Sequence, residues 1–168
     1  MERIERTAIR NLIHNEPYCR KVLPFIKEDY FTDRLEKVLF TEIYKFVNKY
    51  NNLPTKESLS IEINGNKSIN EDEYKQVTDI LSTLNPEPVN LEWLVETTEK
   101  FCKDRSIHNA VLNGIQIIDG KDKNHTLEYL PELLSNALSV SFDQKVGHDY
   151  LLESKERYDY YNRKEERL

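Results

Sequence analysis

The chain has 168 residues, of which 38% are hydrophobic and 32% charged, and its mean hydropathy is −0.72. The net charge of −6 argues against a main nucleic-acid-binding surface, because neutralising phosphates requires clustered Lys and Arg. Cys19 and Cys102 lack a metal-type spacing and favour free thiols in a reducing compartment. With no signal peptide and no apolar run near the ~20 residues of a membrane span, the sequence predicts a soluble, cytoplasmic protein without a membrane partner.

Residues 1–85 are predicted to form a globular helical subdomain. Glycine is scarce and apolar residues recur mostly every three or four positions, which predicts an all-α fold. A first helix ends near Asn15, and Pro17 opens a second one. Asp33 with Glu36 indicates a capping box for a strong helix over residues 34–50.

Two readings are possible for residues 55–69. Thr55 is a plausible N-cap for a short helix, whereas alternating apolar residues before Asn64-Gly65 are typical of a hairpin. The helix is preferred because the return strand, residues 67–69, would be very short. Asn70 with Glu73 predicts a capping box for the next helix, and the prolines within residues 85–90 mark the clearest internal boundary.

Residues 86–142 are predicted to form a long αα-hairpin that mediates oligomerisation. A helix over residues 91–118 ends at Asp119-Gly120, and Pro131 begins a return helix. Two apolar stripes follow the long helix. One comprises Leu94, Phe101, His108, Leu112 and Ile115, and the other Ile107, Val111, Ile115 and Ile118. A helix that is apolar on two sides needs two partners, so one stripe is expected to remain free for another subunit. The predicted oligomer interface is Ile107, Val111, Ile115, Ile118, Leu134 and Leu138.

Residues 143–168 are predicted to be a hinge at Gly147 and a C-terminal linker helix. This helix lacks a terminating residue, so we expect the chain to be the front part of a larger protein. Its predicted docking residues are Tyr150, Leu151, Tyr158 and Tyr161. The helix could also fold back on its own domain, or its tyrosines could stack on single-stranded bases.

The sequence contains no motif for catalysis. It has neither a G-x-x-x-x-G-K-[ST] loop nor a G-x-G-x-x-G motif, and the four histidines are not spaced as metal ligands. We therefore expect no catalytic residue, no cofactor and no metal in this segment.

Three segments carry a resemblance to a known family: VLPFIKEDYF (22–31), WLVETTEKF (93–101) and ALSVSFDQKVGHDY (137–150). The chain resembles the N-terminal domain and linker helix of DnaB-type hexameric replicative DNA helicases, most closely those of T4-like bacteriophages. The resemblance implies a non-catalytic collar whose hairpins, residues 91–118 with 131–142, pair within a hexameric ring. It also implies that primase docks on the collar and that residues 150–168 pack against the neighbouring subunit's motor domain. ATP and Mg would belong to the absent RecA-like motor, and DNA would be bound by the full ring.

A second hypothesis is a stand-alone all-α adaptor or a single-stranded-DNA-binding accessory protein of replication. It predicts DNA binding by this chain alone, weakened by salt.

Overall fold

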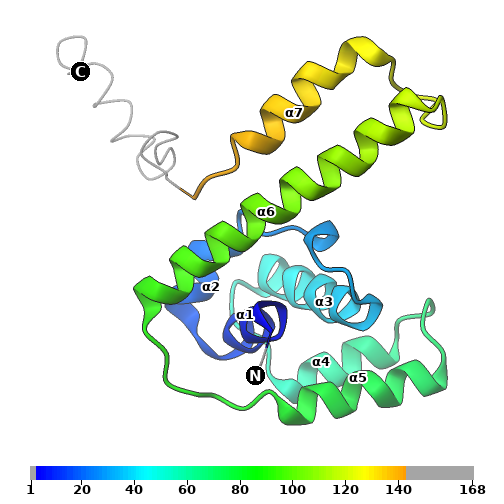
Figure 1. Cartoon of the computed structure of the whole chain (residues 1–168). Coiled ribbons are helices and arrows are strands. Elements are labelled where there is room, and N and C mark those ends of the chain that lie inside the picture. Colours follow the sequence, from blue (N-terminus) through cyan, green and yellow to red (C-terminus); the bar gives the residue numbers. More distant parts are fainter. Residues whose placement is uncertain (1–2, 143–168) are drawn as a thin grey trace.

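Helices account for every regular element within residues 3–142, the part of the chain that this computed structural model describes (Figure 1). The all-α prediction is confirmed for these residues. In chain order the elements are α1 (Ile4–His14), α2 (Glu16–Val22), the 3₁₀ turn η1 (Glu28–Tyr30), α3 (Arg34–Tyr50), α4 (Lys56–Asn64), α5 (Glu71–Thr83), α6 (Leu91–Ile118), the 3₁₀ turn η2 (Leu127–Tyr129) and α7 (Leu130–Leu138).

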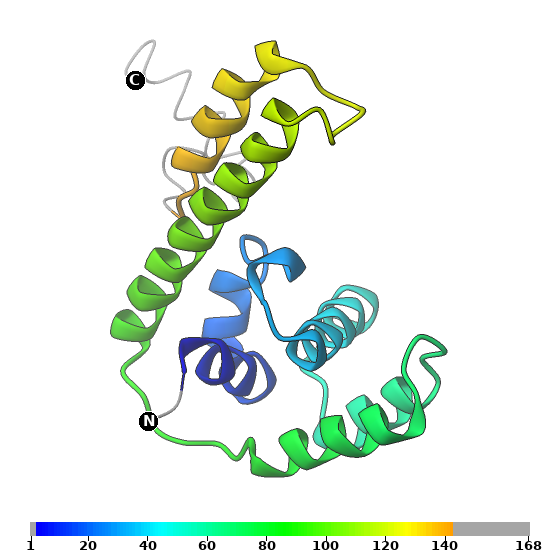
Figure 2. The same ribbon diagram turned by 45° about the vertical axis from the view of Figure 1, so that its right-hand side comes forward.

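The body of the molecule consists of α1–α5 and the first half of α6. In Figures 1 and 2, α3 lies between the α1–α2 pair on one side and the α4–α5 pair on the other. Its inner side chains Leu39 and Ile43 are fully buried, as are Leu12 of α1 and Leu59 of α4. Because one continuous core joins these helices, the body presents a fixed platform for α6.

The first half of α6 closes this core, and the second half leaves the body. Leu94, Phe101 and Cys102 belong to the same buried cluster as the residues of α1–α3. Beyond them α6 continues outward, and α7 runs back antiparallel along its distal half (Figures 1 and 2). The result is a helical arm attached to the body by a helix that contributes to both.

Side-chain caps fix where the helices begin. The Asn15, Asp33, Thr55, Asn70 and Asn90 side chains accept hydrogen bonds from backbone N–H groups in the first turns of α2, α3, α4, α5 and α6. Each satisfies donors that have no partner within the helix. The predicted bounds 34–50 and 91–118 are those observed, and the Asn70–Glu73 capping box is confirmed.

The predicted capping box at Asp33 is only half correct. Asp33 Oδ1 accepts from the N–H groups of Leu35 and Glu36, but the Glu36 side chain does not return to the cap. Glu36 is fully buried instead, and its Oε2 accepts from Arg3 and, at 2.9 Å, from Arg6 Nε. A buried carboxylate requires charged partners, and Arg6 of α1 and Arg3, which immediately precedes α1, supply them.

The choice of a helix over a hairpin before Asn64-Gly65 is confirmed, because α4 extends to Asn64 and Gly65 caps it. Gly120 adopts φ +76°, the left-handed conformation that ends α6 as predicted. The return helix differs in its limits. α7 starts at Leu130, with Pro131 within its first two positions, and ends at Leu138 rather than near residue 142.

Candidate subunit interface on the helical hairpin

Small side chains let α6 and α7 approach closely. Ala110 and Gly114 of α6 are buried against α7, and a Cβ on Gly114 would lie 3.3 Å from Leu130 Cδ2. Ala137 of α7 is also buried, and the Ser106 hydroxyl donates to its carbonyl at 3.4 Å. Close contact through small residues leaves most large side chains of the distal α6 on the outside of the hairpin, with Ile117 as the buried exception.

All six side chains of the predicted interface are exposed. The exposed fractions are 36% for Ile107, 48% for Val111, 49% for Ile115, 64% for Ile118, 40% for Leu134 and 67% for Leu138. By contrast, Leu12, Leu39 and Ile43 in the core of the body are 0% exposed. We call these six residues the hairpin face. A contiguous apolar surface of this kind is typical of an interaction site.

Helical geometry places the hairpin face on one flank of the arm. At about 100° per residue, its four α6 members span an arc of roughly 80° next to the side that faces α7. Leu134 and Leu138 lie roughly 60–100° from the buried Ala137 on α7. Because α6 and α7 run in opposite directions, the angular offsets on the two helices lead to the same flank of the hairpin. The pairing role of this flank stays a prediction.

The other predicted stripe is wrong beyond the body. Leu94 and Phe101 are buried, but His108 and Leu112 point to solvent, with Leu112 50% exposed. The inner side of the distal α6 is formed by Ala110, Gly114 and Ile117. Sequence reasoning followed the large apolar residues, whereas the small pair four positions apart was the signal for close helix packing.

Polar groups limit the hairpin face at both ends. Toward the body, on the same flank of α6, Lys100 Nζ pairs with Asp104 Oδ2 at 3.0 Å. At the tip, Asp122 Oδ2 contacts His125 Nδ1 at 3.2 Å, and the His125 ring stacks on Tyr129 with ring centres 4.1 Å apart. Hydrogen bonds from the Asn124 backbone and His125 lower the pKa of Asp122. The apolar stretch therefore covers about three turns of α6, roughly 18 Å.

Contacts at the base hold the arm at a fixed angle to the body. Glu99 Oε2 on α6 accepts from the Phe142 backbone N–H at 2.9 Å and from the Ser141 hydroxyl at 3.2 Å. The Phe142 ring stacks on Phe25 with ring centres 5.0 Å apart. The chain after α7 is thus fastened to the body at residues 141–142, and the hairpin face keeps a defined direction.

Among residues 3–142, no group of His, Cys, Asp and Glu is placed to hold a metal ion. Burial raises the pKa of Cys19 to about 11 and that of Cys102 to about 12, so both thiols stay protonated at neutral pH and are poor nucleophiles. The His14 ring bonds to the Leu84 carbonyl at 2.7 Å, which accounts for that histidine structurally. Between residues 3 and 142, no helix is long and apolar enough to cross a membrane.

The predicted hinge and linker helix lie outside the described residues. Their predicted functional residues are Gly147, Tyr150, Leu151, Tyr158 and Tyr161. Their roles remain predictions.

Comparison with known proteins gives a match over most of the chain. Over 151 residues, 85% of this chain, the sequence is 32% identical to the DnaB-like replicative helicase of Enterobacteria phage T4. The matched part covers 32% of that protein's length. No protein-family model matches the chain. The resemblance inferred from three short segments is confirmed by this match.

Proposed function

We propose, on the premise that this chain is related over most of its length to a DnaB-like replicative helicase, that it is the non-catalytic N-terminal collar of such an enzyme. The collar pairs subunits within a hexameric ring and docks primase at the replication fork. The full-length protein is then an ATP-dependent DNA-unwinding motor, with ATP and Mg bound outside this segment. The observation that carries the proposal is the hairpin face, an apolar flank on an arm that projects from a complete core.

The size of the hairpin face favours weak pairing between two copies. Fully burying one Val, Leu or Ile side chain stabilises by about 1.5–3 kcal/mol, so six half-exposed side chains contribute roughly 5–9 kcal/mol per subunit. Association costs an estimated 4–15 kcal/mol or more, which offsets much of the gain from two such faces. Pairing of this strength is marginal for free collars. It becomes effective when motor domains hold six collars together, because tethering raises their effective concentration.

Light scattering tests the pairing. Residues 1–168 are expected to be monomeric at micromolar concentration and to form dimers as the concentration rises, while the full-length protein with nucleotide forms hexamers. Val111→Asp and Ile118→Asp should abolish the dimers without lowering the unfolding midpoint. Ile61→Asp is the matched control, because Ile61 is 67% exposed on α4 of the body, away from the arm.

Two results would argue against the collar. A full-length protein that stays monomeric with nucleotide would remove the basis for the ring. If the two α6 variants fail to fold, those side chains belong to the core and the interface is misplaced. Primase docking is tested separately by adding primase to residues 1–168 and following complex formation by gel filtration.

A further inference from the structure

One side of α6 carries a seven-residue pattern along the whole helix, which runs unbroken from the body to the tip of the arm (Figures 1 and 2). Residues 93, 97, 100, 104, 107, 111, 114 and 118 follow one another at alternating intervals of four and three. At about 100° per residue they form one stripe, roughly 90° from the side that faces α7 and about 130° from the side that faces the body. We call this stripe the α6 seam. Its spacing is the heptad pattern of helices that pair in a coiled coil.

The α6 seam has a charged centre between two apolar ends. Trp93, the one tryptophan of the chain, lies at the body end and is 54% exposed. The centre is formed by Lys100 and Asp104, whose side chains are 76% and 64% exposed. The end near the tip of the arm contains three residues of the hairpin face: Ile107, Val111 and Ile118. A helix that covers the whole seam must therefore present apolar, charged and apolar surface in that order.

A second copy of α6 presents this order when it runs antiparallel. Lys100 and Asp104 each lie two positions from residue 102, and Trp93 and Val111 each lie nine positions from it. With residue 102 of one copy opposite residue 102 of the other, Lys100 faces Asp104 twice, once on each side of the two-fold axis. Trp93 of each copy then faces Val111 of the other. The α6 seam is thus complementary to itself, as an interface between two identical subunits requires.

Other alignments of two seams lose this match. Sliding antiparallel copies by one step of the pattern places Lys100 opposite Val111 in one direction and Asp104 opposite Trp93 in the other, so charges would be buried without a partner. A parallel arrangement in register places Lys100 opposite Lys100, and the like charges repel. If only the two hairpin faces meet, Trp93 stays uncovered and the contact shortens. It then runs from residue 107 to 118, roughly 17 Å, instead of from 93 to 111, roughly 27 Å.

The ion pair within one α6 leaves its charges available to a second copy. Lys100 Nζ carries three N–H donors and the Asp104 carboxylate accepts at two oxygens, and their 3.0 Å contact engages one of each. Both side chains stay largely exposed, so each can bind a further charge without breaking the first pair. Two such pairs that point in opposite directions place the four charges in alternating order. A charged layer of this kind in a coiled coil fixes the direction and register of the helices.

We propose that two copies of this chain pair through the α6 seam, antiparallel about residue 102, with Trp93 of each copy packed on Val111 of the other. The inference rests on the pairing of collars proposed above and adds its geometry. The hairpin face of one copy is covered by the body end of α6 of the other, and the two hairpin faces do not cover each other. Lys100 and Asp104 determine the register, and the apolar layers on both sides of them supply most of the attraction.

The fluorescence of Trp93 tests this alignment, because no other tryptophan contributes to the signal. Residues 1–168 are measured over the concentration range in which light scattering shows dimers forming. The emission maximum should move to shorter wavelength, and quenching by acrylamide should fall at least twofold, as Trp93 becomes covered. If dimers form while emission and quenching stay those of the monomer, the alignment is wrong and the pairing of collars still holds.

Charge reversal in two separate variants tests the register. Lys100→Glu leaves two acids at the centre of the seam and Asp104→Lys leaves two bases, so each variant alone should dimerise at least tenfold more weakly. An equimolar mixture should recover the dimer, because the acidic seam of one variant fits the basic seam of the other. The ion pair within a single helix cannot produce recovery that appears only on mixing.

Matched variants on α5 control for general effects of charge. Lys75→Glu and Asp79→Lys make the same two changes at the same spacing on exposed positions of the body. They should alter dimerisation less than twofold, alone or mixed. Circular dichroism verifies the fold of all four variants, and the Trp93 measurement on the unmodified chain decides the alignment should a variant fail to fold.

Three outcomes would overturn the proposal: unchanged Trp93 fluorescence in the dimer, no recovery in the mixture, or equal recovery with the α5 variants. If residues 1–168 form no dimer at any concentration, the pairing of collars fails and the alignment fails with it. Light scattering therefore reports on the proposed function, whereas fluorescence and mixing report on the alignment alone.

Discussion

A buried hydrogen bond between Tyr18 of α2 and Thr98 of α6 gives the sharpest test of how the arm is joined to the body. Both side chains are fully buried, and the two hydroxyl oxygens are 2.7 Å apart. The Thr98 hydroxyl donates its own proton to the Leu94 carbonyl, also at 2.7 Å. The Tyr18 hydroxyl must therefore be the donor to the Thr98 hydroxyl. Removing the Tyr18 hydroxyl and removing the Thr98 hydroxyl should consequently differ in their effect on stability.

This donor order predicts unequal effects of the two single substitutions. Tyr18→Phe removes one hydrogen bond and leaves Thr98 bonded to the Leu94 carbonyl, so it should cost about 1 kcal/mol of stability. Thr98→Val strands the Tyr18 hydroxyl in an apolar interior, which should cost about 2–3 kcal/mol. The double variant replaces both partners by apolar groups of similar shape and should cost no more than Tyr18→Phe alone.

Urea unfolding followed by circular dichroism measures all three variants against the parent chain. With an m-value of about 2 kcal/mol/M, Thr98→Val should lower the midpoint by about 1–1.5 M at an unchanged m-value. The double-mutant cycle should give a coupling energy of at least 1 kcal/mol. Additive effects, or a larger loss for Tyr18→Phe than for Thr98→Val, would refute the donor assignment and the account of this junction.

Three further predictions concern single positions. Burial raises the pKa of Cys102 to about 12 from 9.0, so only the unfolded state ionises this thiol above pH 9. Stability should therefore fall as pH rises, by about 1.4 kcal/mol per pH unit from this thiol, and Cys102→Ala should flatten the decline seen in urea titrations between pH 8 and 11. Gly120→Ala should cost about 1–2 kcal/mol in thermal unfolding because of its positive φ, whereas Gly65→Ala, at φ −84°, should not destabilise. Glu36→Gln should cost about 1.5–3 kcal/mol by urea unfolding because it removes a buried charge that two arginines bind, while Arg34→Ala in an exposed pair should leave the midpoint nearly unchanged.

Local signals in the sequence predicted the helices well. Asp33, Thr55 and Asn70 cap the helices that the sequence predicts them to cap, and Gly120 ends α6 at the predicted place. Caps and left-handed terminators act within one helical turn, so their effect depends on adjacent residues alone. Boundaries set by such residues can be read from a sequence without knowledge of the fold.

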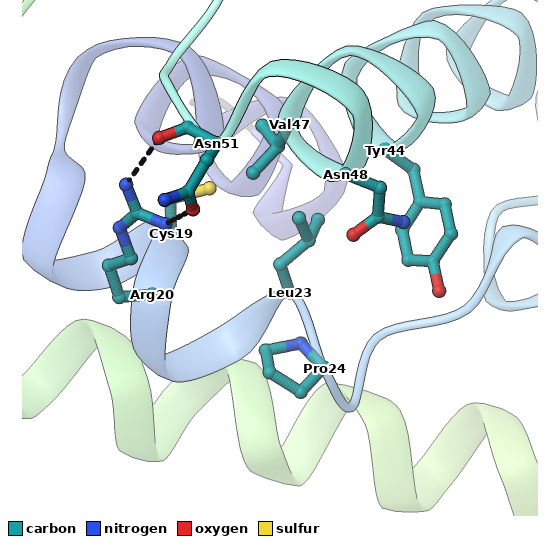
Figure 3. A pocket seen from close by; sticks show the side chains of 8 residues that line it. All are labelled: Cys19, Arg20, Leu23, Pro24, Tyr44, Val47, Asn48 and Asn51. Carbon is teal, nitrogen blue, oxygen red and sulfur yellow. Dashed lines mark hydrogen bonds between the residues drawn. The ribbon is translucent and has the colours of Figure 1, made fainter.

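Contacts between helices were harder to predict, since they depend on which neighbour comes close. Glu36 has the sequence position of a capping-box residue, yet it is buried and binds Arg3 and Arg6 at the start of the chain. His108 and Leu112 follow an apolar stripe, yet Ala110 and Gly114 face α7. The hollow between α2 and α3, whose lining includes Arg20, Leu23 and Val47 (Figure 3), gave no sequence signal, because its lining comes from two helices and the segment after α2, whose relative placement only the tertiary structure defines.

The way the arm is attached to the body bears on the pairing that we propose for the hairpin face. Flexible partners lose conformational freedom on binding, and that loss is subtracted from the gain of the contact. Here α6 is continuous from the core to the arm, Tyr18 bonds its first half, and Glu99 fastens the chain that returns from α7. The face is therefore ordered before any partner arrives, and little further ordering is required when two copies meet. In the ring that we propose, weak but preorganised pairing would let each contact open without the loss of the whole assembly.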